Sequence, residues 1–227
     1  MKKFSIFQLA LLASASLFVA SSLASCSDDD ENNNSTSKTT PLVGGTVPAV
    51  SEAVDLGLAS GTLWAPYNVG ASTAGEAGAL VAWGEANVKS SYEESNYAGT
   101  ADVDAAVSNW GSEWKTPTSE QLQELISSCK WTWQDAGVYA SGASAGYLIA
   151  STAEGNGNSI FLPVNRDRTN PSSNTTERCG YYWSTDLLKD NPDDYALYLF
   201  FTPLQTGTVG NGGNRYLGHS VRAVVAK

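Results

Sequence analysis

The spacing of apolar residues predicts one clear helix in the second half of this chain. Apolar side chains recur at i, i+3, i+4 and i+7 from Leu122 to Cys129, which places them on one face of a helix. A start signal precedes them, because Thr118 is followed three residues later by Gln121, the spacing of a capping box. We therefore predict a helix over residues 117–129, with Cys129 on the buried side of its last turn.

The remaining apolar runs are short, and most of them predict strands. A weaker helical pattern covers residues 103–110. The other runs are rich in β-branched and aromatic residues and are bounded by turn residues, such as Asn156-Gly157. Residues 202–217 are rich in glycine and predict a long loop or an irregular hairpin. The predicted strands are residues 131–133, 147–150, 159–164, 195–201 (apolar on both faces, hence central) and 220–226. The pattern as a whole predicts an α+β fold.

The first 25 residues have the pattern of a secretory signal. Two lysines precede a broken apolar run, which ends in Leu23-Ala24-Ser25 directly before Cys26. This arrangement resembles the lipoprotein box of bacteria, in which the cysteine thiol is acylated and becomes the new N-terminus. One alternative is an ordinary cleaved signal peptide with a chance cysteine. The other is a membrane-spanning helix, for which the run is too short.

The residues after Cys26 predict where the chain is displayed. The acidic run over residues 28–31 resembles the surface-export signal of lipoproteins in Bacteroides-like bacteria. We expect an outer-membrane protein that faces the cell exterior, with acyl chains such as palmitate at Cys26 as its contact with the membrane. Residues 27–40 hold no apolar side chain and are expected to stay unfolded. The expected organisation is a signal peptide over 1–25, the lipidated cysteine and a spacer over 26–50, and one domain over 51–227.

Charge and cysteine content narrow the possible partners. The chain has 13 basic and 23 acidic residues, a net charge of −10, and cleavage after residue 25 removes two of the lysines. A protein with this much negative charge does not attract nucleic acid through its overall electrostatic potential. Apart from Cys26 the chain holds Cys129 and Cys179, and such a pair in an oxidising compartment predicts a disulfide. The alternative is two buried thiols that do not meet.

The sequence offers little for catalysis. A hydrolase triad or a histidine-based zinc site needs histidine, and the chain has only His219, which we expect at the surface beside a strand. Several aspartates over residues 186–194 could supply oxygen ligands to calcium, but they lack an ordered spacing, and the alternative is a solvated loop. We therefore predict a protein that is not an enzyme and needs no cofactor or metal.

Several short phrases, taken together and in order, resemble one protein family. In this order they resemble the Fibrobacter succinogenes major paralogous domain, over residues 54–226. The phrases include Val54-Asp55-Leu56-Gly57-Leu58, Asn68-Val69-Gly70-Ala71, Ala82-Trp83-Gly84-Glu85, Trp114-Lys115-Thr116-Pro117-Thr118, Gly180-Tyr181-Tyr182-Trp183-Ser184 and Gly218-His219-Ser220-Val221-Arg222.

The resemblance implies a C-type-lectin-like fold. Such a fold has mixed short strands, two helices, long loops and paired N- and C-terminal strands, so residues 55–58 would pair near residues 221–225. The tripeptides by which C-type lectins hold a sugar through calcium are missing. Asn191-Pro192-Asp193 is the nearest segment and has the wrong order. Family membership implies the fold more than the function.

The variable loops at 164–180, 186–195 and 202–217 would then form a ligand face. Arg166 and Arg168 could clamp a carboxylate or a polar glycan, unless they form a local ion-pair network with Asp167. We expect a non-enzymatic binding module for a glycan or a protein. The alternatives are a cysteine-dependent enzyme related to formylglycine-generating oxidases, and a fimbria-like structural subunit. The residues predicted to contact the ligand are Arg166, Asp167, Arg168, Tyr195, Asn211, Asn214 and Arg215.

Overall fold

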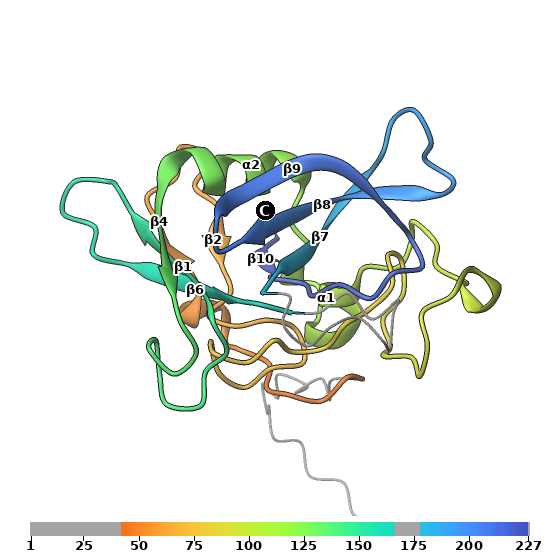
Figure 1. The fold of residues 1–227 in the computed structure, drawn as a ribbon, viewed down its shortest axis with the longest axis horizontal. Coiled ribbons are helices and arrows are strands. Elements are labelled where there is room, and N and C mark those ends of the chain that lie inside the picture. Colours follow the sequence, from red (N-terminus) through yellow and green to blue (C-terminus); the bar gives the residue numbers. More distant parts are fainter. Residues whose placement is uncertain (1–41, 166–177, 227) are drawn as a thin grey trace, which may run out of the picture. The chain divides into compact units, whose positions relative to one another are not determined.

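A computed structural model of the chain describes residues 42–165 and 178–226. These residues form three antiparallel sheets and two α-helices, joined by long irregular segments (Figure 1). The α+β class predicted from the sequence is confirmed. The three predicted strand segments between residues 131 and 164 are present as one meander, and residues 195–201 form the middle strand of another sheet.

The first sheet joins the two ends of the domain. In it β10 lies between two earlier strands, with Val224 opposite both Trp64 and Lys115. The predicted pairing of β10 with residues 55–58 is wrong, because the chain leaves the sheet after Asp55. A turn at Gly57, with φ +68°, directs the following residues into the core. The strand order is β1 (Val54–Asp55), β2 (Leu63–Trp64), β10 (Val224–Val225) and β3 (Trp114–Lys115).

The other two sheets are meanders of three strands each. One consists of β4 (Cys129–Gln134), β5 (Gly146–Ser151) and β6 (Ser159–Pro163), and the other of β7 (Gly180–Leu187), β8 (Tyr195–Thr202) and β9 (Gln205–Asn214). The glycine-rich stretch 202–217, predicted as a long loop or an irregular hairpin, contains the ten-residue strand β9, which forms a hairpin with β8 through register shifts. Its glycines allow close packing, since a Cβ at Gly213 would lie 2.9 Å from the Tyr198 ring.

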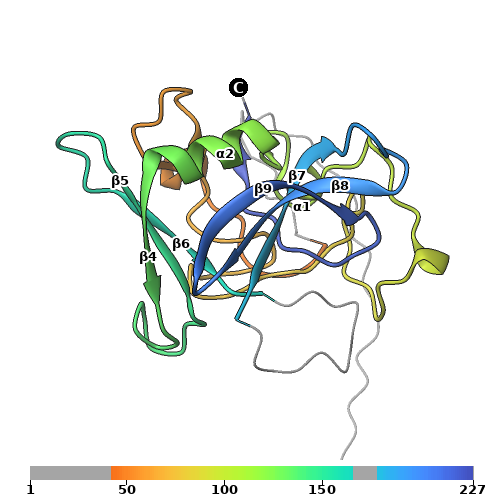
Figure 2. The ribbon, with the colours of Figure 1, turned by 45° about the horizontal axis from the view of Figure 1, so that its top comes forward.

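Two helices precede the meanders in the chain. α1 (Ala105–Trp110) begins where the Asp104 carboxylate accepts hydrogen bonds from the backbone of residues 106 and 107, so its start is later than predicted. α2 (Ser119–Ser128) has the predicted capping box, in which Gln121 N donates to Thr118 Oγ1 at 3.2 Å. It packs against the β7–β8–β9 sheet (Figure 2). Cys129 is the C-cap of α2 and the first residue of β4, with an extended backbone, and is not in the last helical turn.

The predicted disulfide between Cys129 and Cys179 is absent. Cys129 pairs with Ser151 at one end of the β4–β5–β6 sheet. The carbonyl of Cys179 accepts from Asn165 N at 3.0 Å, beyond the opposite end, where β5 begins at Gly146. The length of β5, roughly 16 Å, separates these ends, whereas a disulfide needs Cα atoms within about 7 Å. Burial raises the pKa of the Cys129 thiol to about 11.

A buried arginine connects the closing segment to the rest of the core. Arg222 is 1 % exposed, and its guanidinium donates to Asn68 Oδ1 at 2.8 Å, to the Ala65 carbonyl at 3.0 Å and to the Phe161 carbonyl at 2.7 Å. No carboxylate of the described residues forms an ion pair with it. Burial lowers the pKa of Arg222 to about 10, so it remains charged at neutral pH.

Candidate functional site

Three residues predicted to contact a ligand line one surface groove. They are Tyr195, Asn214 and Arg215, and the groove has a volume of about 280 Å³. It lies at one end of the β7–β8–β9 sheet, between the segments drawn in yellow and light blue on the right of Figure 1. Five further residues line it: Glu94, Tyr97, Asp193, Asp194 and Tyr216.

Backbone hydrogen bonds bring the walls of this groove together. Tyr195 begins β8 and lies directly opposite Asn214 at the end of β9. Arg215 N then donates to the Asp194 carbonyl at 2.8 Å, and the Arg215 carbonyl accepts from Trp83 N at 2.9 Å. The groove thus combines residues from three segments that are distant in the sequence.

The Arg215 side chain fixes the positions of these segments. Its guanidinium donates to the carbonyl oxygens of Asp193 at 3.1 Å, and of Pro192 and Gly99 at 3.3 Å. Its guanidinium carbon lies 4.5 Å from the ring centroid of Trp83 and 5.3 Å from that of Tyr97. Nε is buried and has no hydrogen-bond partner among the described residues, so a ligand cannot reach it. The arginine therefore holds the chain itself together, and the ligand contact that the sequence predicted for it stays a prediction.

The tyrosines of the groove differ in how their hydroxyl groups are used. Tyr97 donates its hydroxyl hydrogen to the Trp83 carbonyl at 2.8 Å, and burial raises its pKa above the ordinary value, so it stays neutral. The Tyr216 hydroxyl accepts from Asn214 Nδ2 at 3.1 Å. Tyr97 therefore belongs to the frame, whereas Tyr195, Asn214 and Tyr216 present polar and aromatic surface to the groove.

The acidic residues of the groove outnumber its basic residue, Arg215, and none of them forms an ion pair with it. Glu94, Asp193 and Asp194 are all exposed. Asp194 Oδ2 accepts from Asn191 Nδ2 at 3.0 Å. In the part of the chain that the structure describes, the ion pairs join other residues, namely Lys89 with Glu85 and Arg178 with Asp135. The groove therefore carries an excess of negative charge.

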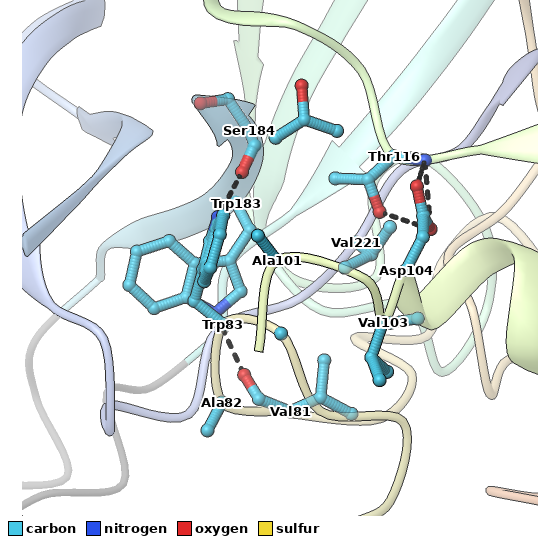
Figure 3. Close-up of a pocket in the computed structure, with 13 residues that line it drawn as sticks. Val81, Ala82, Trp83, Ala101, Val103, Asp104, Thr116, Trp183, Ser184 and Val221 are labelled. Atoms are coloured by element: carbon cyan, nitrogen blue, oxygen red, sulfur yellow. Dashed lines mark hydrogen bonds between the residues drawn. The ribbon is translucent and has the colours of Figure 1, made fainter. Parts of the chain in front are cut away.

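A second, smaller cavity of about 80 Å³ lies behind Trp83 (Figure 3). Several of its polar groups are already used within the protein. Trp83 Nε1 donates to the Ser184 carbonyl at 2.9 Å, and Trp183 Nε1 donates to the Val81 carbonyl at 2.8 Å. The Asp104 carboxylate accepts from both the backbone and the hydroxyl of Thr116. Because the cavity is small and most of its polar side chains are engaged, the groove at Tyr195 is the better candidate site.

His219 lies in the core, whereas the sequence led us to expect it at the surface. It is 1 % exposed, its ring stacks on Trp183 at 4.0 Å between centroids, and neither ring nitrogen has a hydrogen-bond partner among the described residues. Burial lowers its pKa to about 3, which keeps it neutral. Such a histidine has no access to a substrate.

The aspartates considered for calcium do not gather around one point. Asp186 Oδ2 accepts from Ser119 N at 2.6 Å and from Ser119 Oγ at 2.5 Å, so it caps the start of α2. Over residues 42–165 and 178–226, no group of three acidic, histidine or cysteine side chains could hold a metal ion. The same residues include no helix long and apolar enough to cross a membrane.

Several predicted residues fall outside what the structure describes. These are Cys26, Arg166, Asp167 and Arg168, together with the side chain of Asn211. Conversely, the sequence analysis missed Glu94, Tyr97 and Tyr216. Tyr216 could have been found, because it directly follows two predicted residues. No spacing in the sequence connects residues 94–97 to the others. Comparison of the chain with protein-family models, with curated proteins and with solved structures found no match.

Proposed function

We propose that this chain is a non-enzymatic binding module with a C-type-lectin-like fold, anchored by lipid and displayed on the outer surface of the cell. The convergence of three distant chain segments on one groove is the observation that carries the proposal. Arg215, which lies close to the rings of Trp83 and Tyr97, holds the walls of the groove in place. Such a preorganised site favours binding, because few side chains and loops must become ordered when a ligand binds.

The arrangement of the domain supports the fold assignment. The strand near residue 225 lies in the same sheet as β1 and β2, and two helices and long connecting segments accompany the sheets. The family resemblance implies such features, although in this chain β10 pairs with β2 and not with residues 55–58. The groove lies among the connecting segments, where binding residues commonly occur on a rigid scaffold.

The groove suits a polar ligand, either a glycan or a protein side chain. Tyr195 and Tyr216 offer ring surface, and Asn214 and the carboxylates offer hydrogen bonds. The oxidase alternative receives no support from the cysteines. Cys129 and Cys179 lie at opposite ends of a sheet, and the raised pKa of Cys129 disfavours its reactive thiolate.

Binding is tested with residues 38–227, which form one compact unit, on arrays of glycans and extracellular proteins. Tyr195→Ala and Asn214→Ala should each weaken capture about tenfold, since each removes a contact in the groove. Tyr139→Ala and Asn87→Ala, exposed residues outside the groove, are the controls and should bind normally. Absence of any captured ligand, or equal loss in the controls, would contradict the proposed function.

The anchor is tested separately in cells. Cys26→Ala removes the acylated thiol and should release the protein from the membrane fraction, because the acyl chains supply the membrane affinity. Metabolic labelling with a fatty acid checks the reason for the release. Fatty acid that persists on the Cys26→Ala protein would show that the lipidation site is elsewhere.

A further inference from the structure

Whether the groove attracts anions or cations depends on how the guanidinium of Arg215, the basic residue in its lining, is engaged. Arg215 directs its donors at three backbone carbonyls and lies between two aromatic rings. Most of its five donors are therefore engaged by the chain itself or, at Nε, buried. It also forms no ion pair with Glu94, Asp193 or Asp194, which line the same groove. An anionic ligand would meet three carboxylates against one arginine, a net excess of negative charge.

The aromatic lining is a second, independent observation about the ligand. Tyr195 and Tyr216 are half-buried in the groove wall, and neither ring stacks on another aromatic ring of the described residues. The face of a tyrosine ring attracts cations, and arginine guanidinium groups are the most frequent partners. The rings and the carboxylates thus favour the same kind of ligand by different physical effects.

The size of the groove limits the ligand further. A volume of about 280 Å³ is slightly below the usual range for a drug-sized molecule. One long side chain or a single sugar ring fits within such a space. A planar guanidinium can both stack on tyrosine and form two parallel hydrogen bonds with a carboxylate.

We infer that the groove binds the guanidinium or ammonium group of a basic side chain presented by a partner protein. The inference rests on the proposed function, because it names the ligand of the same groove. The partner is recognised through an exposed arginine or lysine, with Glu94 and Asp193 as acceptors and Tyr195 and Tyr216 as the stacking surface.

The first test compares two ligands of almost the same shape. Nα-acetyl-arginine amide and Nα-acetyl-citrulline amide differ in charge, because citrulline replaces the guanidinium with a neutral urea. Residues 38–227 are titrated with each compound, and the chemical shifts of the backbone amides are monitored by NMR. The arginine compound should cause saturable shifts at residues 193–195 and 214–216. The citrulline compound should bind at least about tenfold more weakly. Equal affinity would overturn the inference.

The second test removes charge at the groove and elsewhere. Glu94→Gln with Asp193→Asn should weaken arginine binding about fivefold to tenfold, because both carboxylates are exposed acceptors. Neither side chain forms a hydrogen bond or ion pair among the described residues, so the fold should not change. Glu154→Gln with Asp102→Asn makes the same charge change outside the groove and should leave binding intact. Equal weakening by both pairs would show only a general field effect and would overturn the inference.

Glucosamine and N-acetylglucosamine form a third arm, since an amino sugar also presents an ammonium group. Saturation by glucosamine without saturation by the arginine compound would refute a protein partner. Array results separate this inference from the proposed function. Suppose that a ligand no longer binds the Tyr195→Ala variant but still binds the Glu94→Gln/Asp193→Asn variant. This result would support the proposed binding function and refute the inference that the ligand is a cation. If no ligand depends on the groove residues, both the proposed function and this inference are refuted.

Discussion

Acidification to about pH 4.5 should destabilise this domain through His219, the only histidine in the chain. Its imidazole is 1 % exposed and stacked on Trp183, and it has no acceptor among the described residues that could stabilise an added proton. Its other aromatic neighbours are the rings of Tyr181, at 5.2 Å between centroids, and Tyr198, at 5.0 Å. Protonation in the folded state would therefore place an unpaired charge in the core.

The size of the effect follows from the pKa of His219 in the two states. Burial lowers this pKa to about 3 in the folded domain, from 6.5 in the unfolded chain. Because the unfolded chain binds the proton more readily, the stability is complete above pH 6.5 and is lost as the pH falls from 6.5 towards 3. The free energy of unfolding should fall by about 1.4 kcal/mol per pH unit in this window, or about 3 kcal/mol in total at pH 4.5.

Urea unfolding of residues 38–227 across this pH window measures the effect, with His219→Phe as the reference. Phenylalanine keeps the ring stack and removes two nitrogens that have no partner, so its cost at neutral pH should be small. Glu76 and Asp135, whose pKa values are lowered by hydrogen bonds to Ser72 and Arg178, titrate in both proteins and cancel in the difference. Parallel stability curves for the two proteins between pH 6.5 and 4.5 would refute the reasoning.

Three further predictions concern stability. Trp183→Ala should cost roughly 3–5 kcal/mol, because Trp183 is 1 % exposed in the core; a urea midpoint near that of the wild type would contradict this. Reducing agent should leave the melting temperature unchanged, and Cys129 should alkylate slowly at pH 8 in the native state, as intact-mass spectrometry can show. Asp104→Ala should cost about 1–3 kcal/mol, since its carboxylate caps α1 and binds Thr116; calorimetry checks the loss, and Asp102→Ala is the exposed control.

Signals that act over a few residues predicted their structures well. The capping box of Thr118 and Gln121 marks the start of α2, because both partners of its hydrogen bonds lie within one turn. The apolar run at 195–201 likewise identified the middle strand of a sheet. In each case the deciding interactions are either local or a direct result of burial on both sides of a strand.

Structures that depend on distant partners were predicted poorly. The stretch around Gly207 and Gly213 forms a strand because side chains of α2 and β8 occupy the space beside the glycines, which the glycine pattern alone does not reveal. His219 is buried because Trp183 and Tyr198 surround it. Arg215, which the sequence predicts to contact a ligand, also donates to the carbonyl of Gly99, more than a hundred residues away, and no local pattern reveals that contact.

The central place of β10 also determines when this domain can fold. β2 and β3 each need Val224 or Val225 as a neighbour, so the first sheet stays open until that part of the chain has been synthesised. The Arg222 guanidinium reaches the carbonyls of Ala65 and Phe161 only at the same moment. Such long-range closure is slow, because an entropy cost precedes the favourable contacts. The first sheet is therefore the part of the domain that closes last, whereas each of the two meanders pairs strands that are consecutive in the chain.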